Sequence, residues 1–199
     1  EEKRPGQYFP IFEDEHGSYI LNAKDMSMID HIDDLVDAGI TSLKIEGRAK
    51  SAYYVSVVTN AYRQAVDQYV ADPENYHLAG WLAEEVYKVS HREYCTGFFF
   101  GREQAGQRYE SSSYVRNCDV AAVVQRWENG RLYLSQRNRF FTGDALEVLA
   151  PGQAPVSITA AQLQDGDGQS IETANHAMMD CSIACATAFP AGSMIRKPV

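Results

Sequence analysis

The sequence lacks the features of a membrane or secreted protein. No apolar run approaches the roughly 20 residues that a helix needs to span a bilayer. The first residues, Glu-Glu-Lys-Arg, are charged and no apolar region follows them, unlike a secretory signal peptide. Only four cysteines occur in 199 residues, and their irregular spacing favours a reducing compartment over a disulfide framework. We therefore expect a cytoplasmic protein that contacts no membrane.

An excess of basic charge is also missing. The chain has 18 Lys and Arg against 27 Asp and Glu, which gives a formal net charge of -9. This excludes a protein coated in basic charge for nucleic acid, but it leaves room for a local basic patch, because the field near a site matters more than the sum. With 45% hydrophobic residues the chain can bury a core.

No catalytic or metal-binding constellation with a known local signature is present. Asp14, Glu15 and His16 have no second ligand set spaced to complete a metal site, so a solvated hairpin loop is favoured there. Cys181 and Cys185 form a C-x-x-x-C in a β-type segment, which favours buried thiols over zinc. We predict no metal site and leave the catalytic residues unassigned.

The region from residue 18 to residue 70 has the pattern strand, helix, strand, helix. Short apolar runs at 18–21 and 40–45 predict strands. Apolar residues at helical spacing predict helices at 28–36 and 54–69. This order is typical of two βα units of a parallel sheet, although so few strands cannot close a barrel alone.

Polar clusters follow both predicted strands. In α/β folds, ligands bind outside the carboxyl ends of the strands, so we expect the clusters to lie side by side on one rim. There Arg48 can clamp a carboxylate or phosphate in bidentate fashion while Glu46 orients it. Structural ion pairs between neighbouring charges are the alternative. The candidate substrate-binding residues are Asn22, Lys24, Asp25, Lys44, Glu46 and Arg48.

The second half of the chain has a different pattern. From residue 114, apolar runs become short and turn-separated, which predicts a small all-β barrel of about six strands. Asn129-Gly130 is a strong hairpin signal within it. We therefore predict an α/β part at 1–72, a helical and aromatic connector at 73–113, and a β-barrel at 114–199.

Basic and aromatic residues alternate on the predicted barrel. Trp127, Phe140 and Phe141 lie among arginines in the sequence. This combination on a sheet suits phosphate contact together with base stacking. The alternative is that these residues are scattered over a solvent-exposed face and bind no RNA. The candidate RNA-binding residues are Arg126, Arg131, Arg137 and Arg139.

Three stretches resemble the collagenase-like peptidases of family U32. The run Lys44-Ile45-Glu46-Gly47-Arg48, with 50–55 after it, is similar to the core motif of the family. The runs at 4–10, 13–17 and 19–22 match upstream, in order and at the expected spacing. Residues 137–144 resemble the C-terminal domain that the family appends.

The resemblance implies the C-terminal part of a longer bacterial protein, whose preceding segment holds most of a parallel α/β (TIM-like) barrel. The branch most similar to this chain acts in hydroxylating the wobble uridine of tRNA, which implies that the β-barrel docks tRNA or a partner. A collagenase-like peptidase and a non-catalytic binding module are the alternatives. We expect this part alone to be inactive, because at least half of the barrel rim lies elsewhere.

The resemblance also implies an iron–sulfur cluster in several members of the family. Most of its cysteine ligands would lie upstream of this chain, and one is common at the position of Ser27. Serine is a poor replacement for a thiolate ligand, which puts cluster binding by the whole protein in doubt.

Overall fold

The computed structural model describes residues 5–6, 8, 11–15, 17–19, 23–101, 106 and 114–199. These residues form two compact units. The first unit comprises the described residues of 1–28 and 91–115, and the second comprises 29–90 and 116–199. Within the described ranges, no helix combines the length and the apolar character needed to cross a membrane.

The first unit contains two small sheets. β1 (Phe12–Asp14) and β2 (Gly17–Tyr19) form an antiparallel hairpin. β3 (Asp25–Met26) pairs in parallel with β4 (Tyr94–Cys95). The strand predicted at 18–21 is therefore found in part, at Gly17–Tyr19, but it pairs as a hairpin and not as a βα unit. Residues 20–21 lie outside the described part of the chain.

The helices of the second unit follow the predicted periodicity. A 3₁₀ turn (Ile29–His31) leads into α1 (Ile32–Asp37), followed by α2 (Ala52–Ala71) and α3 (Gly80–Tyr87). Ser51 caps α2, since its side chain accepts a hydrogen bond from the Tyr54 N–H. The buried face of α2 comprises Tyr53, Val57, Val58, Ala61, Ala65 and Tyr69.

The strand predicted at 40–45 is absent, and this prediction was wrong. Gly39, at φ +80°, ends α1 with two bonds, from Gly39 N–H to Val36 O and from Ile40 N–H to Leu35 O. Residue 40 thus belongs to a helix cap, and residues 40–47 continue as irregular chain. Ile45 packs against the apolar cluster around α2 and not in a sheet. Alternating apolar residues give a strand only where a neighbouring strand accepts the hydrogen bonds.

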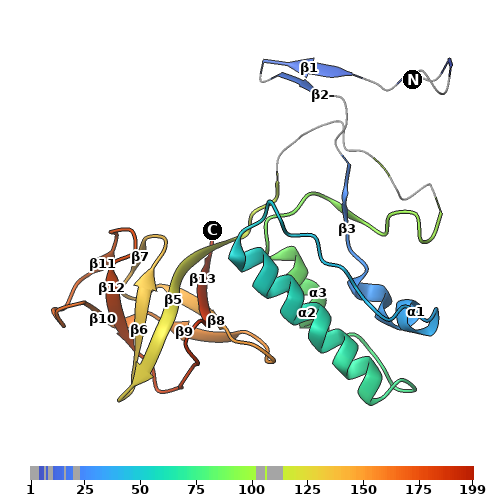
Figure 1. The fold of residues 1–199 in the computed structure, drawn as a ribbon. Helices are drawn as coiled ribbons and strands as arrows, with labels where there is room; N and C mark the ends of the chain where they lie inside the picture. The colour runs from blue at the N-terminus through green and yellow to red at the C-terminus, as the bar shows by residue number, and fades with distance from the viewer. Residues whose placement is uncertain are drawn as a thin grey trace. The chain divides into compact units, whose positions relative to one another are not determined.

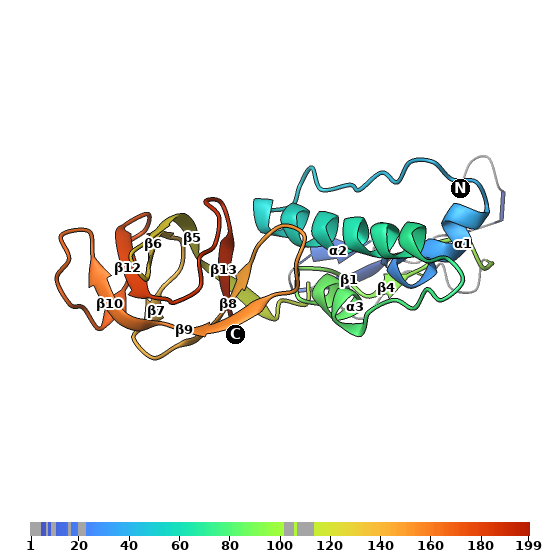
Figure 2. The same ribbon diagram turned by 90° about the horizontal axis from the view of Figure 1, so that it is seen from below.

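The rest of the second unit is a β domain, which confirms the predicted all-β part, although its main sheet is an open half-barrel and not a closed barrel of about six strands. Its main sheet is antiparallel and has seven strands, in the order β10-β12-β6-β5-β13-β8-β9, and β7 pairs with β11 beside it. Figure 2 shows the strands curving around a common core. The strands are β5 (Cys118–Glu128), β6 (Arg131–Gln136), β7 (Phe140–Phe141), β8 (Ala145–Leu149), β9 (Val156–Thr159), β10 (Ala161–Asp165), β11 (Thr173–Ala174), β12 (Asp180–Ala184) and β13 (Met194–Pro198).

The hairpin signal at Asn129-Gly130 is confirmed. The two residues join β5 to β6 with φ values of +50° and +77°. A two-residue turn with both central φ values positive matches the twist of the flanking strands, and Asn and Gly tolerate it best. Inward-facing residues of the strands then fill the core, including Leu132, Leu134, Phe140, Leu146, Ile183 and Ile195.

The first turns of α2, together with Glu85 of α3, contact one part of the outer surface of the β domain (Figure 1). Three side chains of α2, Tyr53, Val57 and Val58, are buried there. They share an apolar cluster with residues of β5, β8 and β13, namely Cys118, Val120, Leu149 and Met194. Asn60 adds polar contacts from α2 to the loop after β8: its side chain accepts from Gly152 N–H at 2.8 Å and donates to Gln153 O at 3.5 Å.

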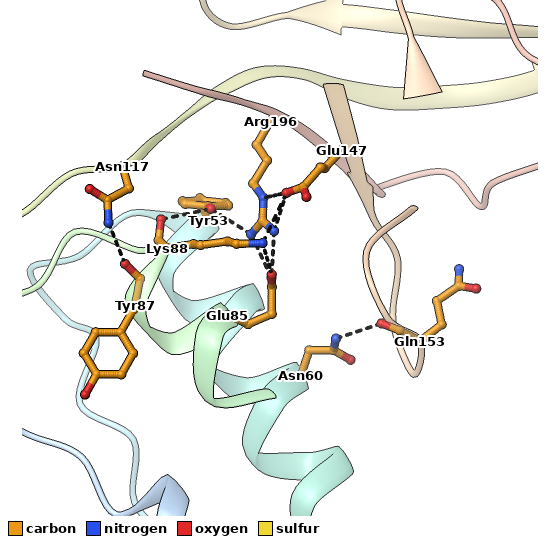
Figure 3. Close-up of polar contacts among 9 residues, drawn as sticks. All are labelled: Tyr53, Asn60, Glu85, Tyr87, Lys88, Asn117, Glu147, Gln153 and Arg196. Carbon is orange, nitrogen blue, oxygen red and sulfur yellow. Dashed lines mark hydrogen bonds and ion pairs between the residues drawn. The ribbon is translucent and has the colours of Figure 1, made fainter. Parts of the chain in front are cut away.

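A buried arginine lies at the centre of this contact (Figure 3). Arg196 of β13 has a fully buried side chain and donates to both carboxylate oxygens of Glu85 on α3, at 2.7 and 2.5 Å. It also donates to Glu147 of β8 at 2.7 Å and to the Tyr53 hydroxyl at 3.1 Å. Lys88 contacts the same two carboxylates, at 3.1 and 3.6 Å. We call these five residues the Arg196 network.

The charges of the network shift one another's pKa values. Burial alone would lower the pKa of Arg196, but hydrogen bonds and charge from Glu85, together with Tyr53, raise it overall. Burial would likewise raise the pKa of Glu147, yet its hydrogen bond to Arg196 and the charges of Arg196 and Lys88 leave that pKa below its usual value. Arg196 and Glu147 are therefore charged at neutral pH, and the contacts of Arg196 join α3 to β8 and β13.

Removing one partner of the buried pair should cost stability. We expect Glu85→Ala to lower the free energy of unfolding by about 3 kcal/mol, because the buried Arg196 charge then loses its bidentate acceptor. Urea unfolding followed by circular dichroism measures the change. The control is Asp67→Ala, which removes the exposed Arg63–Asp67 pair of α2 and should cost less than about 0.5 kcal/mol. Equal costs for the two variants would contradict a stabilising network.

The lowered pKa of Glu147 gives stability a pH dependence. A depressed folded-state pKa means that Glu147 stabilises the fold above its unfolded pKa, and that this contribution is lost as the pH falls through the folded pKa. We expect the free energy of unfolding to decline between about pH 5 and pH 3, and Glu147→Gln to flatten that decline. Glu74→Gln, in the exposed turn after α2, should keep the slope. A Glu147→Gln profile parallel to that of the wild type would refute this assignment.

Candidate functional sites

The first predicted polar cluster, which follows the strand predicted at 18–21 and comprises Asn22, Lys24 and Asp25, has described residues at the pairing of β3 with β4. Lys24 forms an ion pair with Glu93, and Asp25 accepts a hydrogen bond from Arg92 N–H at 3.0 Å. The backbone of Asp25 also takes part in the ladder, with its N–H donating to Glu93 O. The side-chain contacts of Lys24 with Glu93 and of Asp25 with Arg92 therefore join the chain at β3 to the residues just before β4. Asn22 lies outside the described residues.

The second predicted cluster lies on the irregular segment before α2. Lys44, Glu46 and Arg48 are all exposed, and the Glu46 carboxylate accepts a hydrogen bond from Arg48 N–H at 2.9 Å. Gly47 lies against α2, where a Cβ atom would come within 2.8 Å of Val55 Cγ2. A glycine therefore lets this segment run close to the helix. Because the two clusters belong to different units, their shared rim stays a prediction.

The outer surface of the β domain is divided into a covered and an uncovered part. In an antiparallel pair, directly opposite residues share a face, so Arg196 and Glu147 both face the helices. On β6, Leu132 and Leu134 are in the core, which places Arg131, Tyr133 and Ser135 on the outer face. The helices' apolar cluster includes no residue of β6 or β12.

Three of the four predicted arginines belong to the part of the β domain around this outer face. Arg126 of β5 is opposite Tyr133 in the register, and its guanidinium carbon lies 3.7 Å from the centre of the tyrosine ring. Arg131 lies two residues before Tyr133 on β6 and contacts Ser182, which is opposite Tyr133 in the register, whereas Arg137 follows the end of β6 and contacts Ser135. We call Arg126, Arg131, Arg137 and Tyr133 the arginine face. A cation and the face of an aromatic ring attract each other, which gives the contact of Arg126 with Tyr133 a defined geometry.

The arginines of this face differ in what their guanidinium groups bind. Arg131 donates to Ser182 Oγ, Ser182 O and Gln162 O, so it connects β6 with β12 and β10. Arg137 donates to Ser135 Oγ at 2.6 Å and to two backbone carbonyls. Arg126 instead pairs at 3.5 Å with the exposed carboxylate of Glu128, and its side chain is 55% exposed. Arg126 is therefore the most available of the three for a ligand.

The fourth predicted arginine belongs to a separate cluster. The guanidinium of Arg139 lies 5.3 Å from the centre of the Phe141 ring, and Lys197 Nζ lies 5.9 Å from the same centre. Lys197 also pairs with Asp144 at 3.4 Å. The structure thus brings Arg139 together with a lysine from the last strand, and not with the arginine face.

The cysteines do not form a metal site in the described structure. All four are free thiols, and Cys118 and Cys181 are buried. Burial, with the charge of Asp180, raises the pKa of Cys181 to about 11, so this thiol stays protonated at neutral pH. Among the described residues, no three His, Cys, Asp or Glu side chains are grouped to hold a metal ion.

Sequence reasoning missed Tyr133, Lys197 and the Arg196 network. Tyr133 could have been found, because the alternation of Arg131, Leu132, Tyr133 and Leu134 places the tyrosine on the polar side of a strand. Lys197 gave no such signal, since its proximity to Phe141 depends on how β13 enters the sheet.

Comparison with known proteins identifies relatives of the whole chain. The model of peptidase family U32 matches residues 1–109, and that of the peptidase family U32 C-terminal domain matches residues 116–196. The tRNA hydroxylation protein P of Escherichia coli (strain K12) is 33% identical over 179 residues, which cover 87% of this chain and 38% of that protein. The tRNA hydroxylation protein P1 of Bacillus subtilis (strain 168) is 30% identical over 194 residues, covering 94% of this chain and 45% of that protein.

A relative with a different name is also similar. A collagenase of Porphyromonas gingivalis is 32% identical over 155 residues, which cover 77% of this chain and 37% of that protein. The chain spans less than half the length of each of these three relatives.

The different contacts of Arg126 and Arg131 predict different costs on truncation. Arg131→Ala should lower the free energy of unfolding by about 2 kcal/mol, because it leaves the buried Ser182 hydroxyl and two strand contacts without their donor. Arg126→Ala, which removes an exposed cation–π contact, should cost about 0.5 kcal/mol. Thermal and urea unfolding of the two variants measure these costs. A reversed order would show that Arg131 is not structural.

Proposed function

Because the chain belongs to peptidase family U32, we propose that it is the C-terminal part of a protein that acts in tRNA hydroxylation, and that its β domain contacts the tRNA. The names of the similar E. coli and B. subtilis proteins support the first part of this proposal. The arginine face supports the second part, and it is the observation that carries the proposal.

The arginine face has the chemistry of an RNA contact. It presents a guanidinium stacked on an aromatic ring, with two further arginines alongside, on a chain whose formal net charge is -9. RNA is contacted through phosphate charge and through stacking on aromatic or guanidinium planes. The stacked guanidinium of Arg126 offers both, since its charge meets phosphate and its free plane can meet a base.

We propose a separate place for the chemistry. β3 and β4 are parallel, and the chain between them passes through three α-helices, as in a βαβ crossover. They would be two strands of a parallel α/β barrel whose other strands lie in the remaining length of the protein. In that arrangement Lys24, Asp25, Lys44, Glu46 and Arg48 line the rim with Asn22, and the reaction takes place there.

An iron–sulfur cluster fits the described residues poorly. Ser27 offers a hydroxyl oxygen where family members commonly place a thiolate, and cluster irons are held by cysteine sulfur. The four cysteines of this chain give no grouped ligand set in the described part. We therefore assign no cluster ligand to this chain, and we place its action in the cytoplasm, in accord with its free thiols.

Peptidase activity is the second candidate function. The similarity to the P. gingivalis collagenase supports it. A protease site needs an activated nucleophile or a metal-bound water with a base in reach. In the described structure, Glu46 accepts a hydrogen bond from the Arg48 backbone, which does not by itself make such a site. RNA binding therefore remains the leading proposal.

Salt-dependent binding of tRNA tests the proposal. The whole protein should bind total tRNA with an affinity that falls steeply with salt, because phosphate contacts release counterions. The double variant Arg126→Gln/Arg137→Gln should reduce the slope of log affinity against log salt by roughly 1.5, about 0.7 to 0.9 for each lost contact. Arg63→Gln on α2, outside the arginine face, is the matched control.

Three outcomes separate the candidate functions. A reduced slope for the double variant, with an unchanged slope for the control, supports docking through the arginine face. Equal slopes for the two variants would place the RNA contact elsewhere. Absence of binding by the wild type at low salt would reject the RNA proposal and make peptidase activity the first candidate.

A further inference from the structure

Phe141 is an aromatic residue that the fold leaves half in solvent. Its neighbour Phe140 is fully buried in the core of the β domain, whereas Phe141 is 41% exposed. The two residues form the short strand β7, so alternation sends one ring inward and the other outward. The core therefore accounts for Phe140 and leaves the outward ring of Phe141 without a role in packing.

The backbone that carries Phe141 is firmly positioned. Phe141 pairs with Thr173 of β11, and its N–H donates to the Asp144 carboxylate at 2.9 Å. The following residue, Thr142, donates to Glu172 O at 3.0 Å. An aromatic ring on a fixed backbone offers contact area at little entropic cost, because only two side-chain torsions remain to be ordered.

Two cations from distant parts of the chain lie beside the ring. Arg139 immediately precedes β7, and Lys197 comes from β13 at the end of the chain. Lys197 follows the buried Arg196 on β13 but takes no part in the Arg196 network, since its Nζ lies near the Phe141 ring and the Asp144 carboxylate. The lone carboxylate among these contacts, Asp144, already accepts from Phe141 N–H and contacts Lys197.

The combination of an exposed ring and two adjacent cations matches one ligand class. A nucleobase stacks on an aromatic face whatever its identity, and a phosphate beside it meets the cationic groups. An acidic peptide would use the charges but not the flat ring, and an apolar partner would remove water from the cations without offering them a charge. The arrangement therefore favours a nucleotide whose base is free to leave its helix.

We propose that Phe141, Arg139 and Lys197 form a binding site for one unpaired nucleotide of the RNA, with its base on the Phe141 ring and its phosphate at the two cations. This inference rests on the proposed function and adds a subsite to it. The site lies apart from the arginine face, and it selects for single-stranded character and not for base identity, because every base has a π-face.

Stacking is tested with a fluorescent base. The probe is a single-stranded octanucleotide of uridine with one central 2-aminopurine, whose fluorescence falls when the base stacks. The whole wild-type protein should quench the probe, Phe141→Leu should bind it roughly 5- to 100-fold more weakly with little quenching, and Phe141→Trp should restore both. Tyr87→Leu, at an exposed tyrosine of α3 outside the site (Figure 3), is the matched control and should resemble the wild type.

The results distinguish this inference from the proposed function. Unchanged affinity and quenching in Phe141→Leu, together with wild-type tRNA binding, would overturn the nucleotide site and leave the arginine face standing. Loss of affinity in Tyr87→Leu equal to that in Phe141→Leu would also overturn the site. If the wild type binds neither the probe nor tRNA, both proposals fail. Urea unfolding with the wild-type midpoint for Phe141→Leu shows that any lost affinity is not lost folding.

Discussion

The buried charge of Arg196 determines how the second unit is organised. A guanidinium with no exposed surface must find acceptors, and here it finds them on α3, α2 and β8 at once. Loss of any acceptor would leave part of a buried charge uncompensated, which is far more costly than loss of a surface pair. The helices are therefore fixed on the sheet at β8 and β13, and an apolar cluster around Tyr53 and Val57 surrounds the network.

This constraint also determines which surface of the β domain is available. Since the network and the apolar cluster draw α2 and α3 onto β5, β8 and β13, the helices do not cover the outer faces of β6 and β12. The arginine face is found on β6, at the residue that follows it and on the end of β5 that pairs with it. One part of the sheet surface, at β8 and β13, thus packs against the helices. The part at β6 and β12 stays uncovered by them and is the candidate RNA interface.

Sequence periodicity predicted the elements whose own residues carry the signal. The repeat in α2 and the Asn129-Gly130 turn needed no distant partner, and both were confirmed. The alternation of apolar residues at 40–45 led to a wrong prediction of a strand, because an irregular segment packed on α2 shows the same pattern as a strand. Arg196 could not be foreseen, since Glu85 lies 111 residues away in the sequence and Glu147 lies 49 residues away. The candidate RNA-binding arginines were chosen because they lie near aromatic residues in the sequence. Only the sheet register separates Arg139 from the other three arginines.

The most direct test of the account is hydrogen–deuterium exchange of the whole protein with and without tRNA. We expect slower exchange on binding in β6, β12 and residues 137–141, with α2 and α3 unchanged, because the helices lie on the other part of the sheet surface. Slower exchange confined to α2 and α3, or no change in the β domain at saturating tRNA, would contradict the claim that the uncovered face of this sheet binds RNA.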